Sequence, residues 1–201
     1  YVHAYKLKDK APQLLEGLPK TVSDFGVGVS YTFDSRDFML NASRGWFMQL
    51  DLTTNPTFLG NNDTYWSAEL QLATYRKAWR GAIIAGELHT RQSTGQVPWP
   101  MLADVGSSNR MRGYYEGRYR DKNVIDAQVE LRQHIWHRNG IVLWLGAAEV
   151  FPRYSDMRFS RILPNAGVGY RWQFKKGVNV RLDYGFSRNG TGFIFNINEA
   201  F

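Results

Sequence analysis

The sequence predicts an all-β protein, an antiparallel up-and-down transmembrane β-barrel of about ten strands. Three observations lead to this fold class. Apolar and polar residues alternate with a period of two over most of the 201 residues, which is typical of strands with one apolar and one polar face. Connections in the second half of the chain alternate between tight and long, as they do between the two rims of outer-membrane barrels. Aromatic residues recur near the ends of the predicted strands, where membrane interfaces would lie.

Taken in order, the elements begin with a short strand candidate at 1–8 and a predicted loop at 11–20. The alternation is clearest at 24–34, where apolar odd positions oppose glycine, serine, threonine and aspartate. The same alternation predicts strands over 46–55, 66–72, 82–92, 125–135, 165–173, 178–186 and 191–201. The segment 141–151 is apolar on both faces until Glu149, so the pattern does not fix its orientation.

The alternation also predicts which side chains face lipid. The apolar set includes Leu50, Leu70, Val129, Val180 and Leu182, and the polar set expected in the lumen includes Asp51, Glu69, Glu130, Arg171, Arg181 and Asp183. The expected aromatic girdles are Phe33, Trp46, Trp172 and Phe201 at the short-turn rim, and Trp66, Phe186 and Phe193 at the long-loop rim. A soluble up-and-down barrel reverses this arrangement, and a period of two does not separate the two cases. The girdles and the strands of roughly ten residues favour the membrane barrel.

The amino-acid composition favours some classes of binding partner over others. The formal charge of +7 suggests an anionic neighbour, and the rings are spread along the chain rather than gathered in one basic patch, which argues against nucleic acid. Outer-membrane lipid and lipopolysaccharide fit better. The chain has no cysteine, and its four histidines form no metal-ligand spacing, so neither a metal nor another cofactor is indicated.

One connection, 93–123, is far longer than the usual ~4–6 residues, which indicates a functional or a disordered loop. Its part at 109–121 carries four arginines and three tyrosines. Such side chains suit packing into a polar cavity and argue against disorder. The alternative is a solvated basic surface loop.

Several motifs resemble the bacterial surface antigen family, the BamA-like barrels and the related two-partner secretion pores. They are Met111-Arg112-Gly113-Tyr114, Gly117-Arg118-Tyr119-Arg120-Asp121, Ala127-Gln128-Val129-Glu130-Leu131-Arg132, Arg181-Leu182-Asp183-Tyr184-Gly185, Gly192-Phe193-Ile194-Phe195 and the final Phe201. The resemblance is strongest over 24–201 and implies one integral barrel domain of the bacterial outer membrane over 1–201, with loop 93–123 folded into the lumen.

The resemblance also implies a site. The loop motif Arg112, Gly113 and Tyr114 would enter the lumen, and Arg112 would meet an acid on the barrel wall, for which Glu149 holds the matching position. A hairpin turn at Asn139-Gly140 would place Glu130 opposite Glu149, and a guanidinium between them would relieve their repulsion. In the alternative, Arg132 or Arg171 neutralises these acids and the loop stays outside. Phe201 resembles the terminal aromatic by which barrels are recognised for insertion.

The resemblance implies a role in insertion or translocation of outer-membrane proteins, with nascent barrel proteins and periplasmic or lipoprotein subunits as possible partners. BamA-like barrels have sixteen strands and preceding POTRA domains, so we expect a C-terminal portion or a reduced relative. A membrane anchor and a small pore are alternatives. An outer-membrane lipid hydrolase is a weaker one, because no serine is placed by sequence next to His89 or His134 and no Gly-x-Ser-x-Gly motif occurs. The protein is therefore expected not to be an enzyme.

Overall fold

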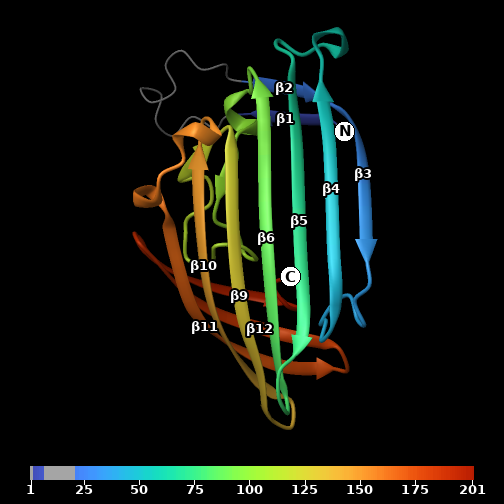
Figure 1. Cartoon of the computed structure of the whole chain (residues 1–201), viewed down its shortest axis with the longest axis vertical. Coiled ribbons are helices and arrows are strands. Elements are labelled where there is room, and N and C mark those ends of the chain that lie inside the picture. The colour runs from blue at the N-terminus through green and yellow to red at the C-terminus, as the bar shows by residue number, and fades with distance from the viewer. Residues whose placement is uncertain (1, 7–20) are drawn as a thin grey trace.

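The computed structural model describes residues 2–6 and 21–201, and its dominant element is a nine-stranded antiparallel sheet with the order β13-β12-β11-β10-β9-β6-β5-β4-β3 (Figure 1). Its strands are β3 (Val27–Asp34), β4 (Gly45–Asn55), β5 (Tyr65–Lys77), β6 (Ala82–Gly95), β9 (Asn123–Trp136), β10 (Asn139–Phe151), β11 (Leu163–Lys175), β12 (Val178–Ser187) and β13 (Gly190–Ile197). Two small pairs complete the fold: β1 (Val2–Lys6) with β2 (Thr21–Phe25), and β7 (Ala103–Val105) with β8 (Tyr119–Asp121). The all-β, antiparallel fold predicted from the sequence is confirmed.

The first strong alternation, at 24–34, is divided in the structure. It contributes the end of β2 and all of β3, with Gly26 between them. Part of the expected strand 1–8 is present as β1, whereas the loop expected at 11–20 lies outside the described residues. Within the described part of the chain no helix is long and apolar enough to cross a membrane. The helical pieces described are single 3₁₀ turns: η2 (Thr57–Leu59), η3 (Trp99–Met101), η4 (Tyr154–Asp156) and η5 (Phe159–Arg161).

Side chains alternate between the two faces of the sheet as the sequence predicts. Along β12, Arg181 and Asp183 are fully buried on the inner face, while Tyr184 and Phe186 are exposed on the outer one. Six of the seven predicted girdle residues are exposed: Phe33, Trp46, Trp66, Trp172, Phe186 and Phe193. The polar face is therefore the concave one, which is the arrangement of a membrane barrel rather than of a soluble barrel.

The β9–β10 hairpin turns earlier than the sequence suggested. Trp136 pairs with Asn139, and His137 adopts a left-handed backbone with φ 51°, so the turn lies at His137-Arg138 rather than at Asn139-Gly140. After an irregularity at Asn139 and Gly140, the register places Glu130 opposite Trp144. The prediction that Glu130 faces Glu149 is therefore wrong.

The sheet coils, and its two edges approach each other at the short-turn end. In Figure 1, β12 runs across behind the lower ends of β9, β6 and β5. Beyond β13, the Glu199 N–H donates to the carbonyl of Leu40 in the β3–β4 connection at 3.4 Å. Among the described residues no ladder joins β3 to β13, so each of these edge strands offers one unpaired main-chain side.

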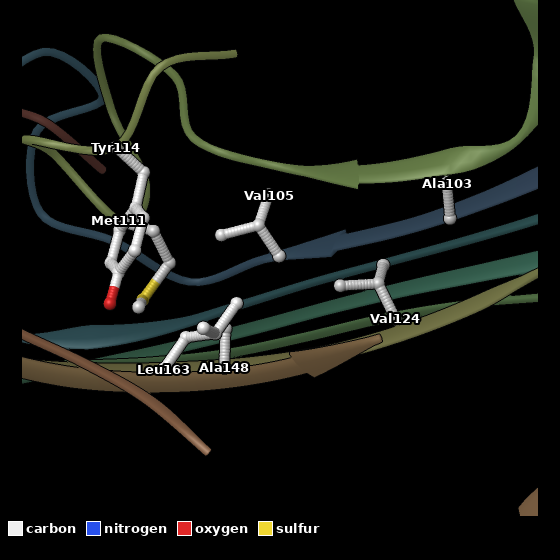
Figure 2. Packing of buried hydrophobic residues seen from close by; sticks show 7 residues of the cluster. All are labelled: Ala103, Val105, Met111, Tyr114, Val124, Ala148 and Leu163. Carbon is white, nitrogen blue, oxygen red and sulfur yellow. The ribbon is translucent and has the colours of Figure 1, made fainter. Parts of the chain in front are cut away.

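The long connection between β6 and β9 folds into the concavity of this sheet. It carries β7 and β8, and its apolar side chains meet the inner wall in one cluster. Figure 2 shows Ala103, Val105, Met111 and Tyr114 of the connection facing Val124, Ala148 and Leu163 of β9, β10 and β11. The loop is thus packed inside the barrel and is not a solvated surface loop.

We expect the outer face to tolerate charge only near its rims. Leu182→Arg, near the middle of β12, should lower the free energy of unfolding in lipid vesicles by about 2–4 kcal/mol, because arginine is costly near the bilayer midplane. Thr191→Arg, at an outward position at the start of β13, should cost about 0–1 kcal/mol near the interface. Urea titrations of both variants test the orientation, and equal costs would contradict it.

Candidate functional site

The long loop buries one arginine, Arg112, against the inner face of the sheet. Arg112 has no solvent exposure, and its Nη1 lies 2.6 Å from Asp183 Oδ2 on β12. Its Nη2 is paired with Glu130 on β9. The guanidinium carbon also lies 3.8 Å from the ring centroid of Trp144 on β10, a cation–π distance. One side chain therefore connects the loop to three strands of the wall.

The two carboxylates that receive Arg112 are shared with arginines of the wall. Arg132 Nε lies 2.8 Å from Glu130 Oε2, and Arg171 Nη1 lies 2.5 Å from Asp183 Oδ1. Of the alternative in which Arg132 or Arg171 neutralises Glu130 and Glu149 while the loop stays outside, only the Arg132–Glu130 pair is present. Arg171 pairs with Asp183 instead, and the loop lies inside. Buried charges need such pairing, since an isolated one is very costly.

Gly113 allows the loop backbone to touch the wall. Its φ is +104°, a region that residues with a side chain rarely adopt. Two wall glycines face it: a Cβ on Gly185 would lie 2.5 Å from the Arg112 carbonyl oxygen, and one on Gly192 would lie 3.1 Å from the Gly113 Cα. The three glycines together form the contact between loop and wall.

Further hydrogen bonds fix the loop on both sides of Arg112. The Tyr114 hydroxyl donates to the Pro164 carbonyl at 2.7 Å, and Ser187 Oγ donates to the Gly113 carbonyl at 3.0 Å. Before the motif, Arg181 Nη2 donates to the carbonyl of Ser108 at 2.8 Å. Both flanks of the motif are therefore bound to the wall.

Glu149 is not part of this site, contrary to the sequence prediction. Its neighbour across the ladder is Ile125, which belongs to the outward row of β9 because inward residues there are the even ones, such as Glu130. Its carboxylate accepts the Arg158 backbone N–H at 2.8 Å, under the β10–β11 connection. The acid missed by the sequence analysis as Arg112's partner is Asp183.

Phe201 also departs from its expected place. The chain leaves the sheet after Ile197, and Phe201 packs inside with Tyr75, at 6.2 Å between ring centroids. Arg132 lies over the Phe201 ring at 5.1 Å and donates to its carbonyl at 2.9 Å. Its predicted position in the lipid-facing girdle is therefore wrong, while its role as an insertion signal stays a prediction.

Glu199 anchors this terminal segment. Its Oε2 lies 2.7 Å from Arg171 Nε, and its Oε1 accepts from Asn179 Nδ2 at 2.7 Å. Burial alone would raise the pKa of the Glu199 carboxyl, but the guanidinium groups of Arg132 and Arg171 more than offset it and hold this pKa below its usual range. The segment after β13 is thus joined to the same charge network as the loop.

Part of the site that the sequence prediction omitted, the acid Asp183, carries a signal in the sequence. The period of two predicts that Asp183 faces the lumen, and Asp183 belongs to the motif Arg181–Gly185. What no local pattern indicates is that Asp183 and Glu130, 53 positions apart, converge on one guanidinium. Gly185 and Gly192 occupy inward positions. Only the contact with the loop at Arg112 and Gly113 explains why both positions are glycine.

A second polar cluster surrounds His89 on β6. His89 Nδ1 lies 2.6 Å from Asp126 Oδ2, and its Nε2 lies 3.0 Å from Glu69 Oε1. The ring thus bridges two wall carboxylates, which accounts for its burial. Within the described residues no group of three histidine, aspartate or glutamate side chains is arranged to hold a metal ion.

The comparisons with known proteins agree with this fold. The structure is similar to the crystal structure of BamA from Haemophilus ducreyi lacking POTRA domains 1–3, with a TM-score of 0.69 and 14% sequence identity over 88% of this chain and 42% of that chain. At that identity the likeness concerns the fold alone, and this chain spans less than half the length of that protein. A comparison with curated proteins finds no match. The Omp85 superfamily domain matches residues 3–201, so the chain belongs to the Omp85 superfamily of outer-membrane assembly and translocation proteins.

Proposed function

We propose that this chain takes part in the insertion of outer-membrane proteins, and that it acts through its sheet edges and rim rather than through its bore. The observation that carries the proposal is the buried contact of Arg112 with Glu130 and Asp183. It holds the loop in the concavity formed by the nine strands of the described sheet. The loop and the buried side chains around it fill this concavity, so little room is left for a polypeptide.

The strand edges support this route. β3 and β13 each have one unpaired side among the described residues, and an exposed edge is a template on which another strand adds. In this proposal the clamped loop keeps the wall in shape while a client strand pairs at an edge. Nascent barrel proteins are the substrate class, and periplasmic or lipoprotein subunits are possible partners.

A reconstitution experiment tests the function. The protein is inserted into phospholipid vesicles, and an unfolded outer-membrane barrel protein is added from urea. We expect its folding rate to rise several-fold over vesicles without the protein or with heat-inactivated protein. An unchanged rate would contradict the insertion function.

The filled interior equally suits a second role, that of a membrane anchor for another module. This alternative predicts normal incorporation into vesicles, no acceleration of client folding and no ion conductance in a planar bilayer. A small pore would instead give stable conductance steps. The lipid-hydrolase alternative predicts release of fatty acids from the vesicle lipid, which the proposal does not.

Removing the central guanidinium should release the loop. In Arg112→Ala, two buried carboxylates lose a partner, a change that typically costs about 3–5 kcal/mol, so protease cleavage within 105–121 on intact cells should rise and client folding should slow. Arg112→Lys should restore only part of the protection, because an ammonium does not bind two carboxylates as a planar guanidinium does. Arg118→Ala, at an exposed loop position, is the control. If wild-type and Arg112→Ala loops are cleaved equally, the clamp has no role.

A side chain at Gly185 should displace the loop without changing any charge. The Cβ of Gly185→Ala would overlap the Arg112 carbonyl, whereas that of Gly86→Ala would meet only Thr74 Cγ2 at 3.6 Å. We expect Gly185→Ala to increase cleavage within 105–121 several-fold and Gly86→Ala to leave it unchanged. Equal cleavage of the two variants would show that close approach of loop and wall is not required.

A further inference from the structure

The outer face of the sheet has a hollow near the long-loop rim. Ala127 on β9 and Ala147 on β10 are cross-strand partners on this face, and Leu88 on β6 lies beside them. Their neighbours along the two strands, Val129 and Leu145, are much larger. The two small side chains therefore leave a depression beside these larger neighbours.

The connection between β10 and β11, residues 152–162, forms the upper wall of this hollow. Met157, Phe159 and Ile162 line it together with Ile125 and the alanines, and this open hollow has a volume of about 200 Å³. That is smaller than the roughly 300 Å³ at which small-molecule pockets begin. An apolar space of this size on a lipid-facing wall suits part of an alkyl chain.

The same connection carries a cluster of positive charge beside the hollow. Arg153, Arg158 and Arg161 are all exposed, and none of them forms an ion pair with an acid of the described chain within 4 Å. Arg158 precedes the 3₁₀ turn η5 and Arg161 ends it. The Arg161 N–H donates to the Arg158 carbonyl at 2.8 Å, so the turn keeps the two arginines in one short segment.

The acids nearby do not cancel this charge. Glu149 lies at the floor of the hollow but is 4% exposed, and its carboxylate accepts the Arg158 backbone N–H. Asp156 is the one acid within 152–162, against three arginines. The exposed rings of Tyr154 and Phe159 complete the surface, with 54% and 94% of their area accessible. Arginines and aromatic rings in this arrangement are typical of the boundary between lipid headgroups and acyl chains.

We propose that the surface formed by Ala127, Ala147 and residues 152–162 is a binding site for lipid A, the phosphorylated and acylated glycolipid anchor of lipopolysaccharide. One acyl chain would lie in the hollow between the alanines and Met157, and Arg158 and Arg161 would bind a phosphate. Long loops of outer-membrane barrels are external, which puts this surface in the outer leaflet, where lipid A resides. Guanidinium groups bind phosphate through paired, charge-assisted hydrogen bonds.

The site is independent of the proposed insertion function. It faces away from the Arg112 clamp, since its strand residues belong to the outward rows of β9 and β10. Binding therefore requires no client protein and can be measured on the isolated full chain.

Native mass spectrometry of the detergent-solubilised protein, titrated with lipid A or with phosphatidylethanolamine, tests the proposal. We expect lipid A to bind at least tenfold more tightly than phosphatidylethanolamine. The double variant Arg158→Gln/Arg161→Gln should lose this preference, and Ala147→Phe, which fills the hollow, should weaken lipid A binding at least tenfold.

Two matched controls separate this site from the general charge and outer surface. Arg80→Gln/Arg138→Gln removes two exposed arginines of the short-turn rim, and Ala68→Phe fills another apolar hollow on the outer face, lined by Val27, Leu52 and Trp66. Both should bind lipid A as the wild type does. The proposal is overturned if lipid A shows no preference over phosphatidylethanolamine, or if the controls weaken binding as much as the site variants. The arginine variants change exposed side chains only, so they report on the site even if Ala147→Phe fails to fold.

Discussion

The structure depends on the burial of one guanidinium between two carboxylates inside a β-sheet. An arginine in water has no desolvation cost. A buried arginine is tolerated only where hydrogen-bond acceptors of opposite charge replace the water around it. Arg112 finds these in Glu130 and Asp183. The loop can therefore enter the concavity only where β9 and β12 bring these acids together. In this sense the wall and the loop specify each other.

Contacts extend from this centre in two directions. Toward the long-loop rim, the apolar cluster of Figure 2 and the Tyr114 hydrogen bond cover the base of the loop. Toward the short-turn end, Arg132 and Arg171 continue through Glu199 to the segment after β13. Two excursions of the chain, one internal and one at its C-terminal end, thus occupy the space that an open barrel would leave to water. This filling is consistent with the proposed route along the sheet edges rather than through the bore.

The outer face differs from the inner face in the residues it carries. Most of it is an unspecific apolar band, as membrane strands require. Glu149 is an exception, because a carboxylate on this face would be exposed to lipid. The 152–162 connection covers it and places its own arginines at the rim, so one segment both shields a charge and creates a basic surface at the expected headgroup level. One loop, 93–123, therefore packs against the interior of the barrel, and another, 152–162, covers part of its exterior.

The sequence by itself determined the strand pattern, the two faces of the sheet and the presence of a long loop rich in arginine. These features could be predicted because a period of two, loop length and composition are local properties. It also identified Glu130 as one acceptor for Arg112. The tertiary structure decided the second acceptor, the outward position of Glu149 and the inward position of Phe201. For Glu149 the physical reason is register, because a hairpin that turns at His137-Arg138 instead of Asn139-Gly140 changes every neighbour of β10 on β9. For Phe201 the reason is that the chain leaves the sheet after Ile197 and packs against Tyr75 and Arg132. The convergence of β9 and β12 on one loop residue depends on sheet curvature, which no stretch of sequence encodes alone.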